Sequence, residues 1–266
     1  MIKSNSFPIG VFDSGIGGTS IWKEINALLP LENTIYLADS KNAPYGEKSK
    51  EDIINLSIKN TELLLQKKCK LIVVACNTAT TNAIKILRNK FDVPFIGIEP
   101  AIKLAALNTK TNTIGILATK GTLNSELFEK TSNTLNKEII IKEIIGKGLV
   151  ELIESKKINS KEMKSLLLSY ISPLMKENVD CLVLGCTHYP YLIPQIKEIV
   201  GNQIQIIDSG RAVAKQTKAI LEKNSLINSS LETSSHQFFI NTNKEVIEMF
   251  TDNKLQKNIT ILEKDF

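Results

Sequence analysis

Two segments of this chain run from a short apolar stretch directly into a cysteine and small polar residues. They are residues 71–78, LIVVACNT, and residues 181–188, CLVLGCTH. Apolar runs of this length, bounded by polar residues, predict strands buried on both faces of a parallel sheet. In open α/β sheets, ligands bind beyond the carboxyl ends of such strands. Cys76 and Cys186 are therefore expected at a substrate site, where one sulfur could lie on each side of a substrate.

Strands and helices alternate along the chain, an order that predicts parallel sheets joined by right-handed crossovers. The first series of strands is expected at 8–12, 34–38, 71–75 and 94–98, with helices at 18–29, 49–67 and 80–90. A second series starts near Thr113, with strands expected at 113–117, 139–145, 180–184 and 203–207, and helices at 124–135, 161–176 and 212–222. Residues 224–235 are rich in Asn and Ser and predict a surface linker, and residues 238–240 and 259–262 are candidates for edge strands.

A short sequence match supports a duplication. Asp13-Ser14-Gly15 and Asp208-Ser209-Gly210 each follow an apolar strand and precede a helix. Together with the cysteine pair, this match suggests that the two series are copies of one ancestral unit. A coincidence between two tripeptides is the alternative.

Composition restricts the class of protein. The chain has 266 residues, 42% hydrophobic and 23% charged, enough for one large or two modest domains. Its apolar stretches are all shorter than the roughly 20 residues that span a bilayer, and its polar N-terminus lacks a secretory signal, so we expect a cytoplasmic protein with no membrane partner. Four cysteines without a CxxC pair, and only two histidines, favour reduced thiols and argue against a metal site.

The net charge of +5 raises the question of nucleic-acid binding. Most of the basic residues are lysines that alternate with Glu and Asn in helical stretches, without an arginine-rich or aromatic-interleaved stripe. This pattern favours a solvated lysine surface and argues against a nucleic-acid partner. A patch that attracts a small anionic substrate is the weaker alternative.

A glycine-rich segment, residues 13–18, follows the first expected strand and opens the first helix. Its free backbone N–H groups favour anions, and its glycines allow a close approach. The alternative, of equal weight, is that Asp13 or Ser14 simply caps the turn and the helix. Because Ser20 stands where a third glycine would be, the segment is not the GxGxxG of dinucleotide-binding sites.

The loop after the second expected strand, residues 38–46, is rich in turn-forming residues. One interpretation is an ordinary loop with Tyr45 packed into the protein. The other is a loop that covers a substrate and offers it backbone N–H groups and the Tyr45 hydroxyl. The segment alone does not decide between them.

The four cysteines fall into two kinds. Cys69 and Cys181 are interpreted as inert small apolar residues. Cys76 and Cys186 each precede an expected helix start, a setting that favours a reactive thiolate. His188 follows Cys186 by two residues and could exchange a proton with it or with the substrate, although a hydrogen-bonded structural imidazole is the alternative.

Six motifs occur in an order that resembles the bacterial glutamate racemase family. They are FDSGIGG at 12–18, AD at 38–39 with PYG at 44–46, ACNTA at 75–79, GIEP at 97–100, AT with GT at 118–122, and GCTHYP at 185–190. Each motif alone is unspecific, but the ordered set spans residues 12 to 210 and is highly specific. The His after Cys-Thr also favours the glutamate enzymes, because the related aspartate racemases typically carry Glu there.

The resemblance implies cofactor-independent interconversion of L- and D-glutamate, which supplies D-glutamate for peptidoglycan. It implies that Cys76 and Cys186 are the two acid/base thiols, with Asp13 assisting the first and His188 the second. The substrate-binding residues implied by the matching motifs are Asp13, Ser14, Tyr45, Gly46, Asn77, Thr78, Thr187 and His188. A further glutamate of the family aligns with Glu154, although the proline that usually precedes that stretch is absent here.

The resemblance also implies an architecture. We expect an α/β protein of two similar doubly wound parallel-sheet domains facing each other across a central active-site cleft. The first domain would comprise residues 1–97 plus 208–266, and the second residues 98–207. Family members are often homodimers, so a homodimer is the expected assembly.

Three alternatives stay open at this point. A related two-thiol racemase could act on aspartate or a hydantoin. A racemase could carry an additional regulatory role, since some members of the family are reported to bind DNA gyrase. A thiol hydrolase could use Cys186 and His188, but it would leave Cys76 without a role.

Overall fold

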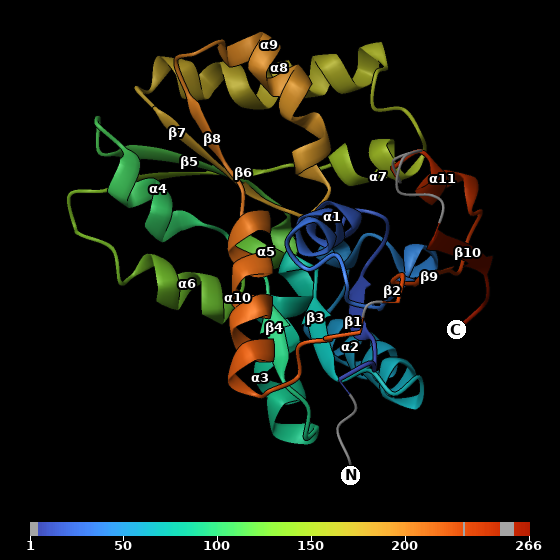
Figure 1. Cartoon of the computed structure of the whole chain (residues 1–266). Helices are drawn as coiled ribbons and strands as arrows, with labels where there is room; N and C mark the ends of the chain where they lie inside the picture. The colour runs from blue at the N-terminus through green and yellow to red at the C-terminus, as the bar shows by residue number, and fades with distance from the viewer. Residues whose placement is uncertain (1–4, 231, 251–257) are drawn as a thin grey trace.

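The computed structural model describes residues 5–230, 232–250 and 258–266, and contains two parallel sheets (Figure 1). The six-stranded sheet has the order β10-β9-β2-β1-β3-β4, and the four-stranded sheet has the order β6-β5-β7-β8. The strands of the first sheet are β1 Ile9–Asp13, β2 Thr34–Ala38, β3 Leu71–Val74, β4 Phe95–Gly97, β9 His236–Ile240 and β10 Ile259–Glu263. Those of the second are β5 Thr113–Ala118, β6 Ile140–Ile145, β7 Cys181–Gly185 and β8 Gln205–Ile207.

The two sheets share one strand order. In each unit the first strand lies between the second and the third, and the fourth lies beyond the third, as in β2-β1-β3-β4 and β6-β5-β7-β8. Cys76 follows the third strand of its unit and Cys186 follows the third strand of the other, so they occupy equivalent positions. The expectation of two similar parallel-sheet units is confirmed. The Asp-Ser-Gly match is not part of the repeat, because Asp13 ends a first strand whereas Asp208 follows a fourth strand.

Helices flank both sheets. They are α1 Thr19–Leu28, α2 Lys50–Gln66, α3 Asn77–Lys90, α4 Ile102–Asn108, α5 Lys120–Leu123, α6 Glu126–Ser132, α7 Leu149–Glu154, α8 Lys161–Lys176, α9 Ile193–Val200, α10 Gly210–Lys223 and α11 Glu245–Glu248. Three 3-10 turns are η1 Ser40–Asn42, η2 Tyr45–Glu47 and η3 Tyr189–Leu192. In Figure 1 the four-stranded sheet lies above the six-stranded one, with α8 and α9 on its outer side.

Several helix boundaries differ from the sequence-based expectation. Helix α3 begins at Asn77 and not at residue 80, because Cys76 itself occupies the N-cap position. The helix expected over 124–135 is the shorter helix α6, which is capped by the Ser125 hydroxyl, and a separate helix, α5, capped by the Thr119 hydroxyl, precedes the expected range. The short helices α4 and α7 had no sequence signal, since helices of six or seven residues depend on tertiary packing for their stability.

The C-terminal segment extends the first sheet. Strand β9 lies between β2 and β10, so of these two C-terminal strands β10 lies at the edge of the sheet and β9 does not, and the expectation of an edge strand is wrong for residues 238–240. A buried cluster anchors β9: the Thr34 hydroxyl accepts a hydrogen bond from the Trp22 indole at 2.8 Å and lies 2.9 Å from Nδ1 of His236. Phe238 packs edge-on against Trp22. The C-terminal segment is therefore an integral part of the sheet whose strands β1 and β3 lead to Asp13 and Cys76.

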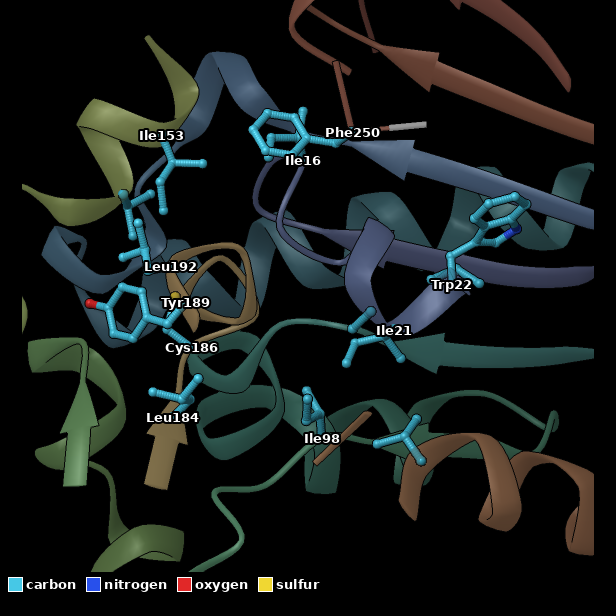
Figure 2. Packing of buried hydrophobic residues seen from close by; sticks show 14 of the residues in the cluster. Ile16, Ile21, Trp22, Ile98, Ile153, Leu184, Cys186, Tyr189, Leu192 and Phe250 are labelled. Carbon is cyan, nitrogen blue, oxygen red and sulfur yellow. The ribbon is translucent and has the colours of Figure 1, made fainter. Parts of the chain in front are cut away.

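The apolar core is continuous between the two units. One cluster of buried side chains contains Ile21 and Trp22 of α1 together with Leu184 and Tyr189 of the second unit (Figure 2). This shared packing holds the strand ends of the two sheets close to each other. Within residues 5–230, 232–250 and 258–266, no helix combines the length and apolar character needed to cross a membrane.

Candidate active site

A small pocket with about 250 Å³ of empty space receives both predicted cysteines. Its lining residues are Ser14, Pro44, Tyr45, Gly46, Cys76, Asn77, Thr78, Thr119, Val150, Cys186, Thr187 and His188. The structure thus brings together the sequence-predicted site residues, except that Asp13 and Glu154 lie behind the lining and contact it from outside. Three lining residues, Pro44, Thr119 and Val150, were not predicted.

Cys76 is held as a neutral thiol. Its sulfur lies 3.4 Å from the backbone N–H of Ala79, which donates to it, and 3.7 Å from the Ser14 hydroxyl. Burial raises the pKa of this thiol well above its usual range, and the negative charge of Asp13 raises it further, against smaller opposing effects of the two hydrogen bonds. Cys76 is therefore suited to donate a proton.

Cys186 has a different environment, because it lies next to a histidine. The Sγ atom is 3.8 Å from Nδ1 of His188, and Nε2 of His188 is 2.6 Å from a carboxylate oxygen of Glu154. Burial alone would lower the pKa of His188, but its hydrogen bonds with Cys186 and Glu154 outweigh burial and raise that pKa well above 6.5. A buried imidazolium thus faces Cys186, and a positive charge at this distance stabilises a thiolate.

The glycine-rich loop between β1 and α1 does bind anions, and these are the protein's own carboxylates. The N–H groups of Gly15 and Gly18 donate to Asp13 at 3.2 and 2.9 Å, and the N–H of Ile16 donates to Glu154 at 2.8 Å. The loop thus accommodates anions, and Asp13 closes the turn through Gly15 and Gly18, but the expectation that Asp13 or Ser14 caps the helix is wrong, because the N-cap residue of α1 is Gly18, which has no side chain.

Asp13 links this loop to the second unit. Its other carboxylate oxygen accepts a hydrogen bond from the Thr187 hydroxyl at 3.2 Å. Full burial raises the pKa of Asp13 to about 6, against the lowering effect of the positive charge on His188. Asp13 is thus mostly ionised at neutral pH, and it acts on Cys76 through its charge.

Two glycines of the loop are required by close contacts with the second unit. A Cβ atom on Gly15 would lie 2.0 Å from a carboxylate oxygen of Glu154, and a Cβ atom on Gly17 would lie 2.2 Å from Nδ1 of His188. His188 is only 1% exposed, so its ring has no free space into which to move. These glycines allow the His188–Glu154 pair to pack directly on the loop backbone.

We predict that Gly17→Ala lowers stability by about 1–3 kcal/mol, the usual cost of overpacking a well-packed interior, and displaces the His188 ring. Chemical denaturation of the wild type and the variant measures this loss. A matched control is the same substitution in a His188→Ala background, where the space of the ring is free. The explanation fails if Gly17→Ala costs the same in both backgrounds.

The Tyr45 hydroxyl is not offered to the pocket, contrary to one of the two interpretations of its loop. It donates to the buried carboxylate of Asp39 at 2.5 Å and accepts from the side-chain amide of Asn60 at 3.1 Å. Tyr45 therefore contributes its ring to the pocket wall, next to Gly46.

The polar lining of the pocket includes one group without a partner. Neither the nitrogen nor the oxygen of the buried Asn77 side chain has a hydrogen-bond partner among the described residues. Buried polar groups are almost always paired, so Asn77 is a ready contact for a bound molecule. The hydroxyls of Thr78, Thr119 and Thr122 bond to one another at 2.8 to 3.2 Å and bring the two units together at this end of the pocket.

The position of Thr119 in the sequence could have identified it as a residue of the site. It follows directly after β5, at the carboxyl end of a parallel strand, where ligand-binding residues concentrate. Val150 had no such signal, because it lies on the short helix α7, whose existence depends on packing. In the described part of the chain, no group of three or more His, Cys, Asp or Glu side chains is arranged to hold a metal ion.

Known proteins resemble the chain in both sequence and structure. A family model described as Asp/Glu/Hydantoin racemase matches residues 9–217. A glutamate racemase of Herpetosiphon aurantiacus is 43% identical over 221 residues, which cover 83% of this chain and 87% of that protein.

Two crystal structures cover nearly the whole chain. A glutamate racemase isoform from Bacillus anthracis superposes with a TM-score of 0.86 at 32% identity and covers 97% of both chains. The glutamate racemase of Escherichia coli, in complex with L-glutamate and the activator UDP-MurNAc-ala, superposes with a TM-score of 0.82 at 32% identity and covers 97% of both chains.

The fold and the relatives together identify the chain as a racemase, which is a class of isomerase. The chain belongs to the Asp/Glu/Hydantoin racemase family.

Proposed function

We propose that this protein interconverts L- and D-glutamate by a two-base proton transfer at Cα, in which one thiol group removes the proton from one face and the other delivers a proton to the opposite face, without a cofactor. The observation that carries the proposal is the presence of Cys76 and Cys186, from equivalent strand ends, in one small pocket. Glutamate is the favoured substrate because the relatives that match most of the chain are named glutamate racemases and one of them was crystallised with L-glutamate.

The two cysteines start from opposite protonation states. Cys186 faces the imidazolium of His188 and serves as the thiolate, whereas Cys76 is held as a thiol by burial and by the charge of Asp13. The Cys186 thiolate removes the Cα proton from one face of the substrate, and the Cys76 thiol delivers its proton to the opposite face. The reaction leaves Cys186 as a thiol and Cys76 as a thiolate, which is the starting state for the opposite enantiomer.

Proton transfer by two positioned groups is not sufficient for an unactivated Cα–H bond. Each acid or base contributes on the order of 10²- to 10⁴-fold, so the carbanion also requires stabilisation. Hydrogen-bond donors held around the α-carboxylate of the substrate, in a site from which water is excluded, provide this stabilisation. Asn77, Thr78 and Thr187 are the side chains proposed for this role, because they line the pocket beside the two thiols.

The proposed role of Glu154 is to position and charge His188, since Glu154 contacts the imidazole from behind. The proposed role of Asp13 is to act on Cys76 through its charge, which favours the state in which Cys76 carries the proton and Cys186 is the thiolate. We further propose that the D-glutamate product serves peptidoglycan synthesis in the cytoplasm, as in the family that the chain resembles.

The test is loss of the circular dichroism signal of purified L-glutamate in the presence of the purified protein and no added cofactor. We expect the signal to fall to zero as the enantiomers equalise, and D-glutamate to behave as the mirror image. Parallel incubations with L-aspartate and with a chiral hydantoin distinguish the related racemases. Turnover of either of these in place of glutamate would overturn the substrate assignment.

A further inference from the structure

The C-terminal segment contacts the loop after β2 through the side chain of Asn241. This residue follows β9 directly, at the carboxyl ends of the strands of the six-stranded sheet, where Asp13 and Cys76 also lie. Its Nδ2 donates to a carboxylate oxygen of Asp39 at 2.6 Å, and its Oδ1 accepts from the backbone N–H of Lys41 at 2.8 Å. The carboxylate can only accept and the backbone N–H can only donate, so the orientation of the amide is fixed by its two partners.

Asp39 connects Asn241 to Tyr45 in the wall of the pocket. Its carboxylate is fully buried and is satisfied by donors from Asn241, Asn42 and the Tyr45 hydroxyl. The Tyr45 hydroxyl donates to the Asp39 oxygen that Asn241 does not contact. A buried ionised carboxylate depends on such donors, so the loss of one donor weakens the whole arrangement.

The loop that Asp39 holds is a wall of the pocket. Pro44 and Gly46 line the pocket on one side and an adjoining groove of about 260 Å³ on the other. The wall fits closely against the second unit, since a Cβ atom on Gly46 would lie 2.7 Å from the side chain of Thr119. A small displacement of this loop would therefore join the pocket to the groove and admit water.

We infer that Asn241 is a positioning residue for the substrate: acting through Asp39 and the Tyr45 hydroxyl, it holds the wall of residues 44–46 closed over the two thiols. The inference assigns to the C-terminal segment a role in substrate binding, in addition to its place in the sheet. It rests on the proposed function only in naming glutamate as the substrate.

The first test measures KM and kcat for glutamate in Asn241→Ala. We expect KM to rise about tenfold, the effect of one hydrogen bond to a charged group, while kcat changes less than about threefold. Asn243→Ala is the matched control, because the side chain of this exposed asparagine bonds to Glu245, two residues along its own segment, and its removal is expected to leave KM unchanged. An unchanged KM in folded Asn241→Ala would overturn the inference.

A double-mutant cycle tests the route of the effect. If Asn241 acts through the Tyr45 hydroxyl, Asn241→Ala should raise KM much less in a Tyr45→Phe background than in the wild type. Additive effects would show that Asn241 does not act through Tyr45. If Asn241→Ala does not fold, Asn241→Ser replaces it in every measurement, since serine keeps a short hydroxyl donor.

A second test needs no substrate and separates this inference from the assignment of glutamate. Iodoacetamide labelling followed by peptide mass spectrometry reports each cysteine individually. A loosened wall should speed labelling of Cys76 and Cys186 in Asn241→Ala, but not of Cys69 and Cys181, which are buried outside the pocket. Equal acceleration at all four cysteines would indicate general unfolding, and no acceleration would indicate an intact wall; either result overturns the inference, even if glutamate proves to be the wrong substrate.

Discussion

Replacing either Cys76 or Cys186 by alanine is expected to lower kcat for glutamate racemisation by at least about 10³-fold, because each thiol serves one face of Cα and neither can reach the other face. Both side chains are small and buried, so alanine leaves the fold and the pocket largely intact. The measurement is polarimetry or circular dichroism from both enantiomers. In D2O, any remaining exchange of the Cα proton should be confined to the enantiomer whose proton faces the thiol that is left.

The chain supplies its own controls for this result. Cys69 and Cys181 are also buried free cysteines, but they lie outside the pocket, so Cys69→Ala and Cys181→Ala should retain nearly wild-type turnover. A mechanism with one base would instead leave one of the pocket variants active in both directions. Substantial racemisation by Cys76→Ala or by Cys186→Ala would therefore contradict the two-thiol mechanism.

The part of the site that could be predicted from the sequence is the part governed by local rules. A buried parallel strand is visible as an apolar run, and its carboxyl end is where ligands bind, so Cys76 and Cys186 could be placed without knowledge of the rest of the fold. The residues within two positions after each cysteine, such as Asn77 and His188, could be placed at the site together with it. The equivalence of the two units followed from the same rule and agrees with the shared strand order.

The part that could not be predicted depends on contacts between distant segments. Asn241 and Asp39 are 202 positions apart, and no local pattern links an asparagine after a late strand to a loop after an early one. The direction of the Tyr45 hydroxyl could not be predicted either, since it is decided by a hydrogen bond to the buried carboxylate of Asp39. Helix α7 could not be predicted for a different reason. A helix of six residues depends on tertiary packing for its stability, so its local sequence does not indicate it.

Contacts between the two units also explain why the glycine-rich loop was ambiguous. Its N–H groups have the anion-binding character that the sequence indicated, but the anion on Ile16 is Glu154, which lies 138 positions away in the second unit. One carboxylate thus joins the first loop, the Ser40 hydroxyl at 3.1 Å and the His188 ring at 2.6 Å. Glu154 therefore links the glycine-rich loop of the first unit to His188 in the second unit.

Replacing Glu154 by glutamine is expected to lower kcat by about 10²-fold at pH 8, because Gln keeps the shape of the side chain but removes the charge opposite His188. Burial lowers the pKa of His188, and the hydrogen bonds with Cys186 and Glu154 overcome it, so removal of the Glu154 charge should lower the pKa of the imidazole and let it lose its proton at a lower pH than in the wild type. The positive charge beside Cys186 is then absent, and the thiolate is no longer favoured.

The sign of the pH dependence distinguishes this mechanism from a general loss of structure. In the wild type the pKa of His188 is raised well above 6.5 by its hydrogen bonds with Cys186 and Glu154, so the ring keeps its proton to a higher pH than it does without the Glu154 carboxylate. In Glu154→Gln that pKa is lower, so the protonated fraction of the ring, relative to that in the wild type, falls as the pH increases from 6.5 to 8.5, and the ratio of variant to wild-type kcat should fall with it. The interval is kept above the pKa of Asp13, which is about 6, so that Asp13 stays mostly ionised in the wild type. Glu162→Gln, on an exposed position of α8, is the matched control, and a variant-to-wild-type ratio for Glu154→Gln that does not change with pH would contradict the proposed role of Glu154.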